Sequence, residues 1–398
     1  MSANQTESEF NPLYEETFDN THTYYEEMRK KCPVAHSNEF GGFWALFKYD
    51  DVLRLQEDTE SFSTADQNIV PRVTRKDGPR PPLHFDPPEH ATFRNPINRI
   101  FKKSRIDKLE STLQGCADEL LVPLVAAGAA DFTKDFAEYF AARAFGEILA
   151  LPLEMMLRAR AVGVRYYRAT TQMDQAEMIQ ASTDLYAIAR EIVESRKTAL
   201  LDPDEDLVSA LLLAGERGKP ISETLVVASI RQFLSAAQAA PGAVLGSIAV
   251  HLARDQALQS QLRADPELMP RAIEESLRMY APYRVFARTA KHDVEIRGRT
   301  IKAGEAITMM FPSANRDEDV FPNPHEFDMN RTPNRHIAFG RGAHQCPAAS
   351  LARLELKIGI GALLQMTEQF ELAGEVKMTD WVEFGPSSTP LRLVGRKV

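Results

Sequence analysis

The stretch Phe339-Gly340-Arg341-Gly342-Ala343-His344-Gln345-Cys346 decides the fold of this chain. Two glycines separated by one residue allow a sharp turn and a close approach of the backbone to a flat partner. The proline that follows predicts the start of a helix over residues 348–364, because proline is favoured in a first helical turn. Cys346 is therefore expected at a helix N-terminus, whose dipole favours a thiolate. A thiolate on a flat surface is typical of an axial haem ligand, whereas an isolated cysteine is more often a small buried apolar residue.

This stretch resembles the cysteine-ligand loop of the cytochrome P450 family, which follows the pattern F-G-x-G-x-H-x-C. Phe339, Gly340, Gly342, His344 and Cys346 match that pattern. The resemblance implies a mainly α-helical fold with small β-sheets. It also implies haem b (iron-protoporphyrin IX) between a long central helix and this loop, with Cys346 as the iron ligand and Phe339 beside the haem.

Composition limits the class of protein. The chain has 398 residues, of which 44% are hydrophobic and 26% charged, as in globular proteins. A net charge of −9 argues against nucleic acid as a partner. Three cysteines without a C-x-x-C pair predict neither a disulfide framework nor a zinc site, and fit a reducing cytoplasm. The polar residues 1–10 show no signal or spanning segment. We expect one cytoplasmic domain over residues 1–398, without a membrane anchor.

A second motif predicts contacts to the haem propionates. Residues 86–90, Asp-Pro-Pro-Glu-His, are typical of a helix start. His90 and Arg94 then lie on one helix face, four residues apart. This spacing matches the H-x-x-x-R of the family's C helix, which implies that both residues bind a propionate. The family resemblance implies the same role for Arg288 and His344.

A third motif, E-x-x-R, is formed by Glu275 and Arg278. Two such residues three positions apart on a helix form an ion pair. The motif lies about seventy residues before the cysteine loop, as the family's K helix does. The resemblance therefore implies a structural ion pair that supports the loop, with Arg331 as a candidate third member.

Residues 221–253 predict one long helix with an apolar centre, which belongs in a protein core. In the family, an acid and an alcohol on this helix relay protons to dioxygen, but here those positions fall on Ala239 and Ala240. Pro241 removes a hydrogen bond from the helix, so we expect a kink and a free carbonyl at residue 237. Gln238, next to that carbonyl, is a candidate to hold a proton-relaying water. We assign residues 238–241 as the altered catalytic segment.

The resemblance also predicts which segments line a substrate pocket. The long loop over residues 60–83, the central helix, the segment after the E-x-x-R helix and the C-terminal strands all contribute. For Arg284 two interpretations remain open: it faces solvent, or it points inward and binds a carboxylate or phenolate. The predicted pocket residues are Val70, Ala236, Ala237, Ala240, Arg284, Val285, Phe286 and Phe384.

The implied activity is a haem-dependent monooxygenase. It inserts one atom of O2 into a small apolar substrate (aromatic, phenolic ether or terpenoid) by hydroxylation or O-dealkylation. Electrons come from a ferredoxin- or flavodoxin-type partner. The basic residues between Arg99 and Lys108 are either a solvated charge run or the docking face for that partner. Two alternatives remain open, a peroxide-driven haem-thiolate peroxygenase and a non-enzymatic haem-based binding or sensing protein.

Overall fold

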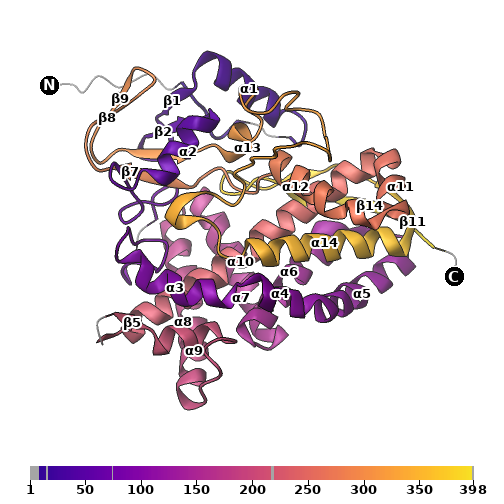
Figure 1. The fold of residues 1–398 in the computed structure, drawn as a ribbon, viewed down its shortest axis with the longest axis horizontal. Coiled ribbons are helices and arrows are strands. Elements are labelled where there is room, and N and C mark those ends of the chain that lie inside the picture. The colour runs from indigo at the N-terminus through magenta and orange to yellow at the C-terminus, as the bar shows by residue number, and fades with distance from the viewer. Residues whose placement is uncertain (1–8, 15–16, 74, 217–218, 397–398) are drawn as a thin grey trace.

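Helices form most of the molecule, and one group of strands lies at the upper left of the view, with other strands at the right and at the lower left (Figure 1). This computed structural model describes residues 9–14, 17–73, 75–216 and 219–396, without the side chains of residues 216, 219 and 237–239. The α-helices are α1 Thr21–Lys31, α2 Tyr49–Glu57, α3 His90–Ile100, α4 Lys103–Ile106, α5 Glu110–Ala127, α6 Glu138–Leu149, α7 Leu153–Thr171, α8 Gln175–Thr198, α9 Leu207–Leu213, α10 Glu223–Arg254, α11 Gln256–Ala264, α12 Met269–Met279, α13 Phe311–Ala314 and α14 Ala349–Met366.

The largest sheet has five strands in the order β1-β2-β10-β7-β3, with only the β2–β10 pair parallel. A second sheet has the order β11-β14-β4, and three two-stranded ribbons complete the set. The strands are β1 Val34–Ser37, β2 Phe43–Leu46, β3 Phe62–Ser63, β4 Ala129–Asp131, β5 Gly215–Glu216, β6 Lys219–Pro220, β7 Ala287–Ala290, β8 Val294–Ile296, β9 Arg299–Ile301, β10 Ala306–Met309, β11 Thr367–Leu372, β12 Lys377–Met378, β13 Pro386–Ser388 and β14 Pro390–Gly395. This confirms the predicted fold class.

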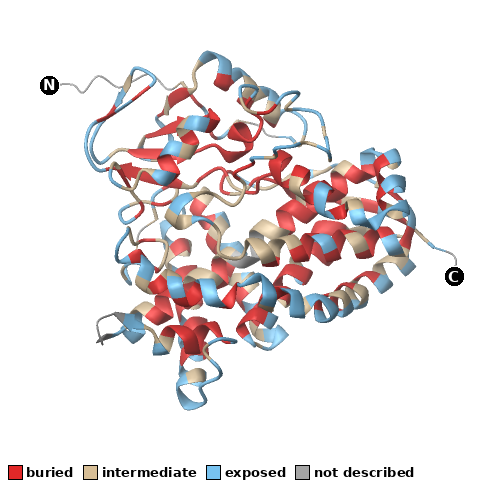
Figure 2. Ribbon diagram, viewed as in Figure 1, coloured by how far each residue is buried: buried red, intermediate tan, exposed pale blue. Residues whose placement is uncertain are grey.

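Helix α10 crosses the interior and packs against α6, α8 and α14. Its apolar residues, such as Val226, Leu234 and Leu245, are buried in the main hydrophobic core. Figure 2 shows buried residues along the inner faces of these helices. Helix α10 is long and apolar enough to cross a membrane, but 73% of its most apolar window is buried within the protein. That burial is what a core helix requires.

The helices predicted over residues 348–364 and 221–253 correspond to α14 and α10, with ends that differ by one or two residues. A π-turn, Phe132–Ala137, precedes α6. Asp131 caps that turn by accepting a hydrogen bond from the backbone N–H of Lys134. Pro241 lies inside α10, which continues as one helix to Arg254, and the kink expected there stays a prediction.

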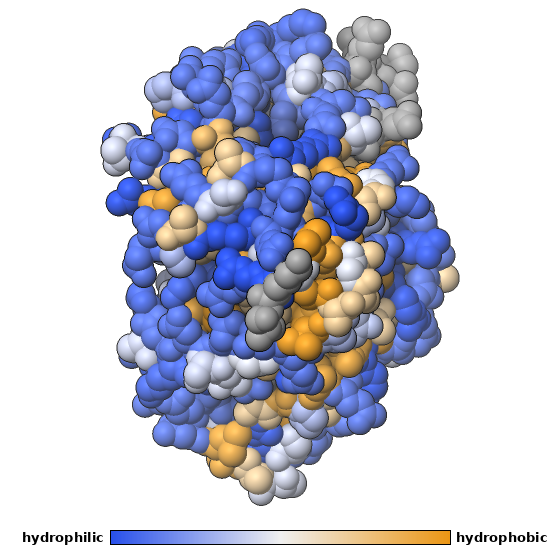
Figure 3. All heavy atoms as spheres, turned by 90° about the vertical axis from the view of Figure 1, so that its right-hand side faces the viewer, coloured by the Kyte–Doolittle hydropathy of each residue, from blue (hydrophilic) through white to orange (hydrophobic). Residues whose placement is uncertain are grey.

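The surface is mainly hydrophilic, in keeping with the charge of the chain. Figure 3 shows this for the face that lies on the right in Figure 1, where apolar side chains gather near the middle. The buried apolar residues, by contrast, form three clusters inside the helical and sheet regions.

Candidate active site

The cysteine loop is fixed by its glycines and by Gln56 of α2. Gly340 and Gly342 have φ angles of 70° and 69°, which side chains with a Cβ rarely adopt. A Cβ on Gly342 would lie 2.8 Å from the carbonyl oxygen of Gln56. The Gln56 side chain accepts a hydrogen bond from the N–H of Arg341 at 2.6 Å. The N–H of Cys346 donates to the carbonyl of Phe339 at 2.8 Å, which closes the loop.

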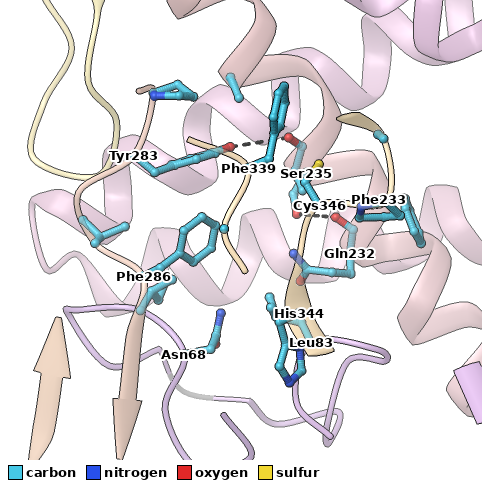
Figure 4. A pocket seen from close by; sticks show the side chains of 18 of the residues that line it. Asn68, Leu83, Gln232, Phe233, Ser235, Tyr283, Phe286, Phe339, His344 and Cys346 are labelled. Atoms are coloured by element: carbon cyan, nitrogen blue, oxygen red, sulfur yellow. Dashed lines mark hydrogen bonds between the residues drawn. The ribbon is translucent and has the colours of Figure 1, made fainter. Parts of the chain in front are cut away.

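Cys346 borders an interior cavity (Figure 4). Burial raises the pKa of its thiol, although a hydrogen bond from the N–H of Ala348 and the nearby Arg94 and Arg353 act in the opposite direction. Pro347 has no N–H to donate. A buried thiol of this kind becomes a thiolate when a metal cation coordinates it. The sulfur therefore has the chemistry of an iron ligand, and its surroundings fit a haem iron.

A buried ion network lies behind the loop. Arg278 donates to both carboxylate oxygens of Glu275, at 2.9 and 2.7 Å, and neither side chain is exposed. Arg331 and Asn334 also donate to this carboxylate, each at 3.1 Å. The Arg331 guanidinium and the Asn334 amide lie in the segment that leads into the cysteine loop. The predicted ion pair is thus present, and the predicted third member joins it.

Four basic side chains meet near the loop without a matching set of acids. The rings of His90 and His344 lie 4.4 Å apart, and Nε2 of His90 is buried without a hydrogen-bond partner among the described residues. Burial lowers the pKa of His90 to about 4 and that of His344 to about 3, and Arg94 and Arg288 add to these shifts. Burial also lowers the pKa of Arg288 to about 10.

The nearest acid to this basic group is Asp86, which is held by other partners. Its carboxylate accepts hydrogen bonds from Ser63 and Thr64 and forms a salt bridge with Lys291 at 3.3 Å. The guanidinium groups of Arg94 and Arg288 require anions in contact with them, and the neutral imidazoles of His90 and His344 can donate hydrogen bonds to the same anions. The propionates of a haem would supply two negative charges at this point, so the residues fit the cofactor.

The cavity has a volume of about 310 Å³ and extends from Cys346 to helix α10 and the 66–84 loop. Four of the predicted pocket residues line it, namely Ala236, Ala240, Val285 and Phe286, and so does Pro241 of the predicted catalytic segment. Figure 4 shows Tyr283 and Phe286 on one wall, with Phe339 and Cys346 on another. Ile69 and Val73 of the 60–83 loop, which was predicted to contribute to the pocket, also line it. The side chains of residues 237–239, including the candidate relay Gln238, lie outside the described part of the structure.

The turn of α10 before Pro241 is held by two tyrosines. The hydroxyl of Tyr167 donates to the carbonyl of Ser235 at 3.1 Å, and that of Tyr283 donates to the carbonyl of Ala236 at 3.4 Å. Burial raises the pKa of both phenols, so both are neutral donors. These bonds attach the helix to two walls of the cavity.

The structure places three predicted pocket residues elsewhere. Val70 packs in a separate core cluster. Arg284 is buried, but it neither faces solvent nor reaches the cavity. Its guanidinium donates to the carbonyls of Trp381 and Asp380, at 2.8 and 3.1 Å, and lies over the ring of Phe384. Phe384 is thereby used in packing. The alternation of apolar and polar residues around Arg284 does not predict these contacts, because the carbonyls that Arg284 binds lie about a hundred residues further along the chain.

Sequence reasoning missed two cavity residues of high charge density, Arg80 and Arg231. A signal for Arg231 was present, since it is an arginine inside an otherwise apolar stretch of a core helix. Arg80 lies in a proline-rich loop and carried no comparable signal.

The basic stretch after α3 is largely neutralised. Lys103 pairs with Asp107 at 2.7 Å, and Arg105 pairs with Glu205 at 2.8 Å. Lys102 is exposed and forms no salt bridge with a described residue. The net positive charge available for docking is therefore smaller than the sequence predicts.

Comparison with known proteins agrees with this geometry. Residues 167–380 match the family model for cytochrome P450. The chain is 30% identical to cytochrome P450-terp of Pseudomonas sp, over 92% of this chain and 91% of that protein. It is also 30% identical to the steroid C26-monooxygenase of Mycobacterium tuberculosis, over 88% of this chain and 87% of that one. The structure resembles that of CYP109E1 from Bacillus megaterium in complex with testosterone, with a TM-score of 0.85, 29% identity and coverage of 94% and 98%.

Proposed function

Because this chain belongs to the cytochrome P450 family of haem monooxygenases, we propose that Cys346 is the thiolate ligand of a haem b. We further propose that the cavity beside it holds a small organic substrate. Such a haem, when bound, supplies the activation of dioxygen and the insertion of one oxygen atom into the substrate. The observation that carries the proposal is the Cys346 sulfur at the wall of a cavity beside which α3, β7 and the cysteine loop bring together four basic side chains.

The residues around the cavity then have separate tasks. His90, Arg94, Arg288 and His344 would hold the propionates and so fix the plane of the cofactor. Apolar side chains such as Phe286 exclude water from the reacting carbon. The substrate body that fits these walls is apolar: an aromatic ring, a phenolic ether or a terpenoid.

The side chain that delivers protons remains a proposal resting on the sequence. Ala240 and the residue before it carry neither the acid nor the alcohol of the family. We assign the task to Gln238, because it lies one residue after the carbonyl that Pro241 leaves without its helical donor.

The experiment that tests the monooxygenase uses purified holoenzyme, a reductant with a ferredoxin-type donor, and isotopically labelled dioxygen. One labelled oxygen atom per product, formed only with reductant, is the expected result. Product formed from peroxide alone would instead support the peroxygenase. Binding of haem and gas without product would support a sensing protein.

We propose a ferredoxin- or flavodoxin-type donor in a bacterial cytoplasm. The exposed Lys102 marks the basic face on which an acidic donor would dock. A Lys102→Glu variant should be reduced more slowly at low salt, and the difference should shrink as salt rises. Equal reduction rates at all salt concentrations would place the docking face elsewhere.

A further inference from the structure

Two buried arginines face the cavity from different elements. Arg231 lies on α10 and is 1% exposed, and Arg80 lies in the loop before α3 and is 4% exposed. Both guanidinium groups lie near the ring of Tyr166 on α7, at 4.4 and 5.8 Å from its centroid. Two positive charges thus meet inside the protein, at the part of the cavity that α7 and α10 line.

The partners of these arginines among the described residues are neutral hydroxyl groups. Arg80 donates to the hydroxyls of Tyr166 and Ser182, at 3.1 and 3.4 Å. Arg231 donates to Ser235 and Ser182, at 3.3 and 3.5 Å. The Nε atom of each arginine is buried and has no hydrogen-bond partner in the part of the chain that the structure describes. Neither arginine forms a salt bridge with a described residue, although such a bridge is the usual condition for burying this group.

A change in protonation does not remove the two buried positive charges of Arg80 and Arg231. Burial lowers the pKa of Arg231 to about 10, which still leaves it charged near neutral pH. For Tyr166, burial raises the pKa but the two guanidinium groups outweigh it, so the phenol is somewhat more acidic than usual. A bound anion would balance the two charges and use the free Nε donors. The serine hydroxyls around them are suited to the same anion.

We propose that the substrate carries a carboxylate, which Arg231 and Arg80 bind at the α10 end of the cavity. This inference rests on the proposed monooxygenase function and adds the polar anchor of its substrate. Arginine suits this task because its fork of N–H groups matches the two oxygens of a carboxylate. The rest of the substrate extends toward Cys346 between apolar walls that include Phe145, Val244 and Phe286.

The helix sets the length of this substrate. The Arg231 guanidinium contacts Ser235, and Ala240 lies five residues further along α10 on the same cavity. Five residues span about 7–8 Å along a helix axis. With the haem beside Ala240, the oxidised carbon lies about that far from the carboxylate. A benzoic acid with a small para substituent has this length, and a para-methoxy group would place an ether carbon at the reacting end.

The test measures binding and requires no turnover. Holoenzyme is titrated with 4-methoxybenzoate and with the neutral 4-methoxybenzamide, and the change in the haem absorption spectrum gives each Kd. We expect the carboxylate to bind about tenfold to a hundredfold more tightly near neutral pH, as charge-assisted hydrogen bonds predict. 3-Methoxybenzoate should bind but yield less O-demethylated product, because its ether carbon lies off the axis.

Variants assign the preference to the two arginines. Arg231→Gln and Arg80→Gln should each reduce the preference for the carboxylate, and Arg231→Lys should keep part of it because the charge remains. Arg165→Gln, an exposed arginine of α7 that pairs with Glu177, is the matched control and should keep all of it. The carbon monoxide spectrum of each variant verifies that it is folded and binds haem.

Equal affinity of the wild type for the acid and the amide would overturn the proposal. So would an unchanged preference in folded Arg231→Gln and Arg80→Gln variants. These outcomes are distinct from a failure of the proposed function. In that case the carboxylate preference would be present but no reductant-dependent product would form.

Discussion

The two walls of the cavity are built on different principles. On the Cys346 wall, backbone geometry and a closed ion network fix every functional group, and each buried charge of that network has a partner. On the α10 wall, two buried cations face neutral hydroxyls and keep free donors. The ion network holds the scaffold of the Cys346 wall in place, and the basic groups near the loop remain for the propionates of a bound haem. On the α10 wall, we propose that the unmatched charges meet an anion of the substrate instead.

Removing the sulfur should have the largest effect on this comparison. A Cys346→Ala variant should lose product formation to background, because no other described side chain on that wall is a thiolate. Cys116→Ala is the matched control, since Cys116 lies in the core cluster away from the cavity. The carbon monoxide spectrum and product formation are measured for both. Retained activity in the first variant would mean that another group holds the iron.

The ion network should account for the next largest effect. Glu275→Gln leaves Arg278 and Arg331 buried without a carboxylate, and breaking a buried pair in this way costs about 3–5 kcal/mol. Urea unfolding measures the change in the free energy of unfolding. The exposed pair of Glu27 and Lys31 provides the control, because Glu27→Gln should change it by about 0.5 kcal/mol or less. A small loss in Glu275→Gln would show that the Cys346 wall does not depend on this network.

The glycine turn of the cysteine loop should contribute less to the free energy of unfolding than the ion network does. Gly342→Ala forces a Cβ into a positive-φ conformation and against the Gln56 carbonyl, which should cost about 1–3 kcal/mol and loosen haem binding. Gly361→Ala in α14 is the counterpart, because a Cβ there meets open space. It should stabilise the protein by about 0.5–1 kcal/mol. Thermal unfolding of both variants checks the two signs, and a stabilised Gly342→Ala protein would contradict a strained turn.

The smallest effect is expected on the α10 wall, from Gln238→Ala. If Gln238 holds the water that relays protons, the product formed per reductant consumed should fall by about tenfold. This loss is smaller than the roughly 100-fold to 10,000-fold contribution of a typical acid–base group. The exposed Gln261 of α11 provides the control variant, Gln261→Ala. Unchanged coupling in Gln238→Ala would eliminate this residue as the relay and would leave water or the substrate itself as the source.

The sequence determined the Cys346 wall almost completely. A short loop with glycines at required positions, a helix start after it and an E-x-x-R pair are local patterns, and their geometry follows from a few neighbouring residues. That is why the resemblance to the family could name Cys346, His344 and the Glu275–Arg278 pair. The apolar pattern predicted α10 as a core helix, and the resemblance predicted the small residues Ala236 and Ala240 on the cavity.

Only the tertiary structure decided which charges meet on the α10 wall. Arg80 and Arg231 are 151 positions apart in the chain, and nothing in either local pattern indicates that they share Tyr166 and Ser182. The same reason explains Arg284, whose partners are the carbonyls near residue 380 rather than solvent or substrate. Long-range packing sets the partner of a buried charge. The sequence by itself therefore determined the cysteine loop and the ion pair behind it, whereas only the tertiary structure brought together the two arginines that we propose as the anchor of the substrate.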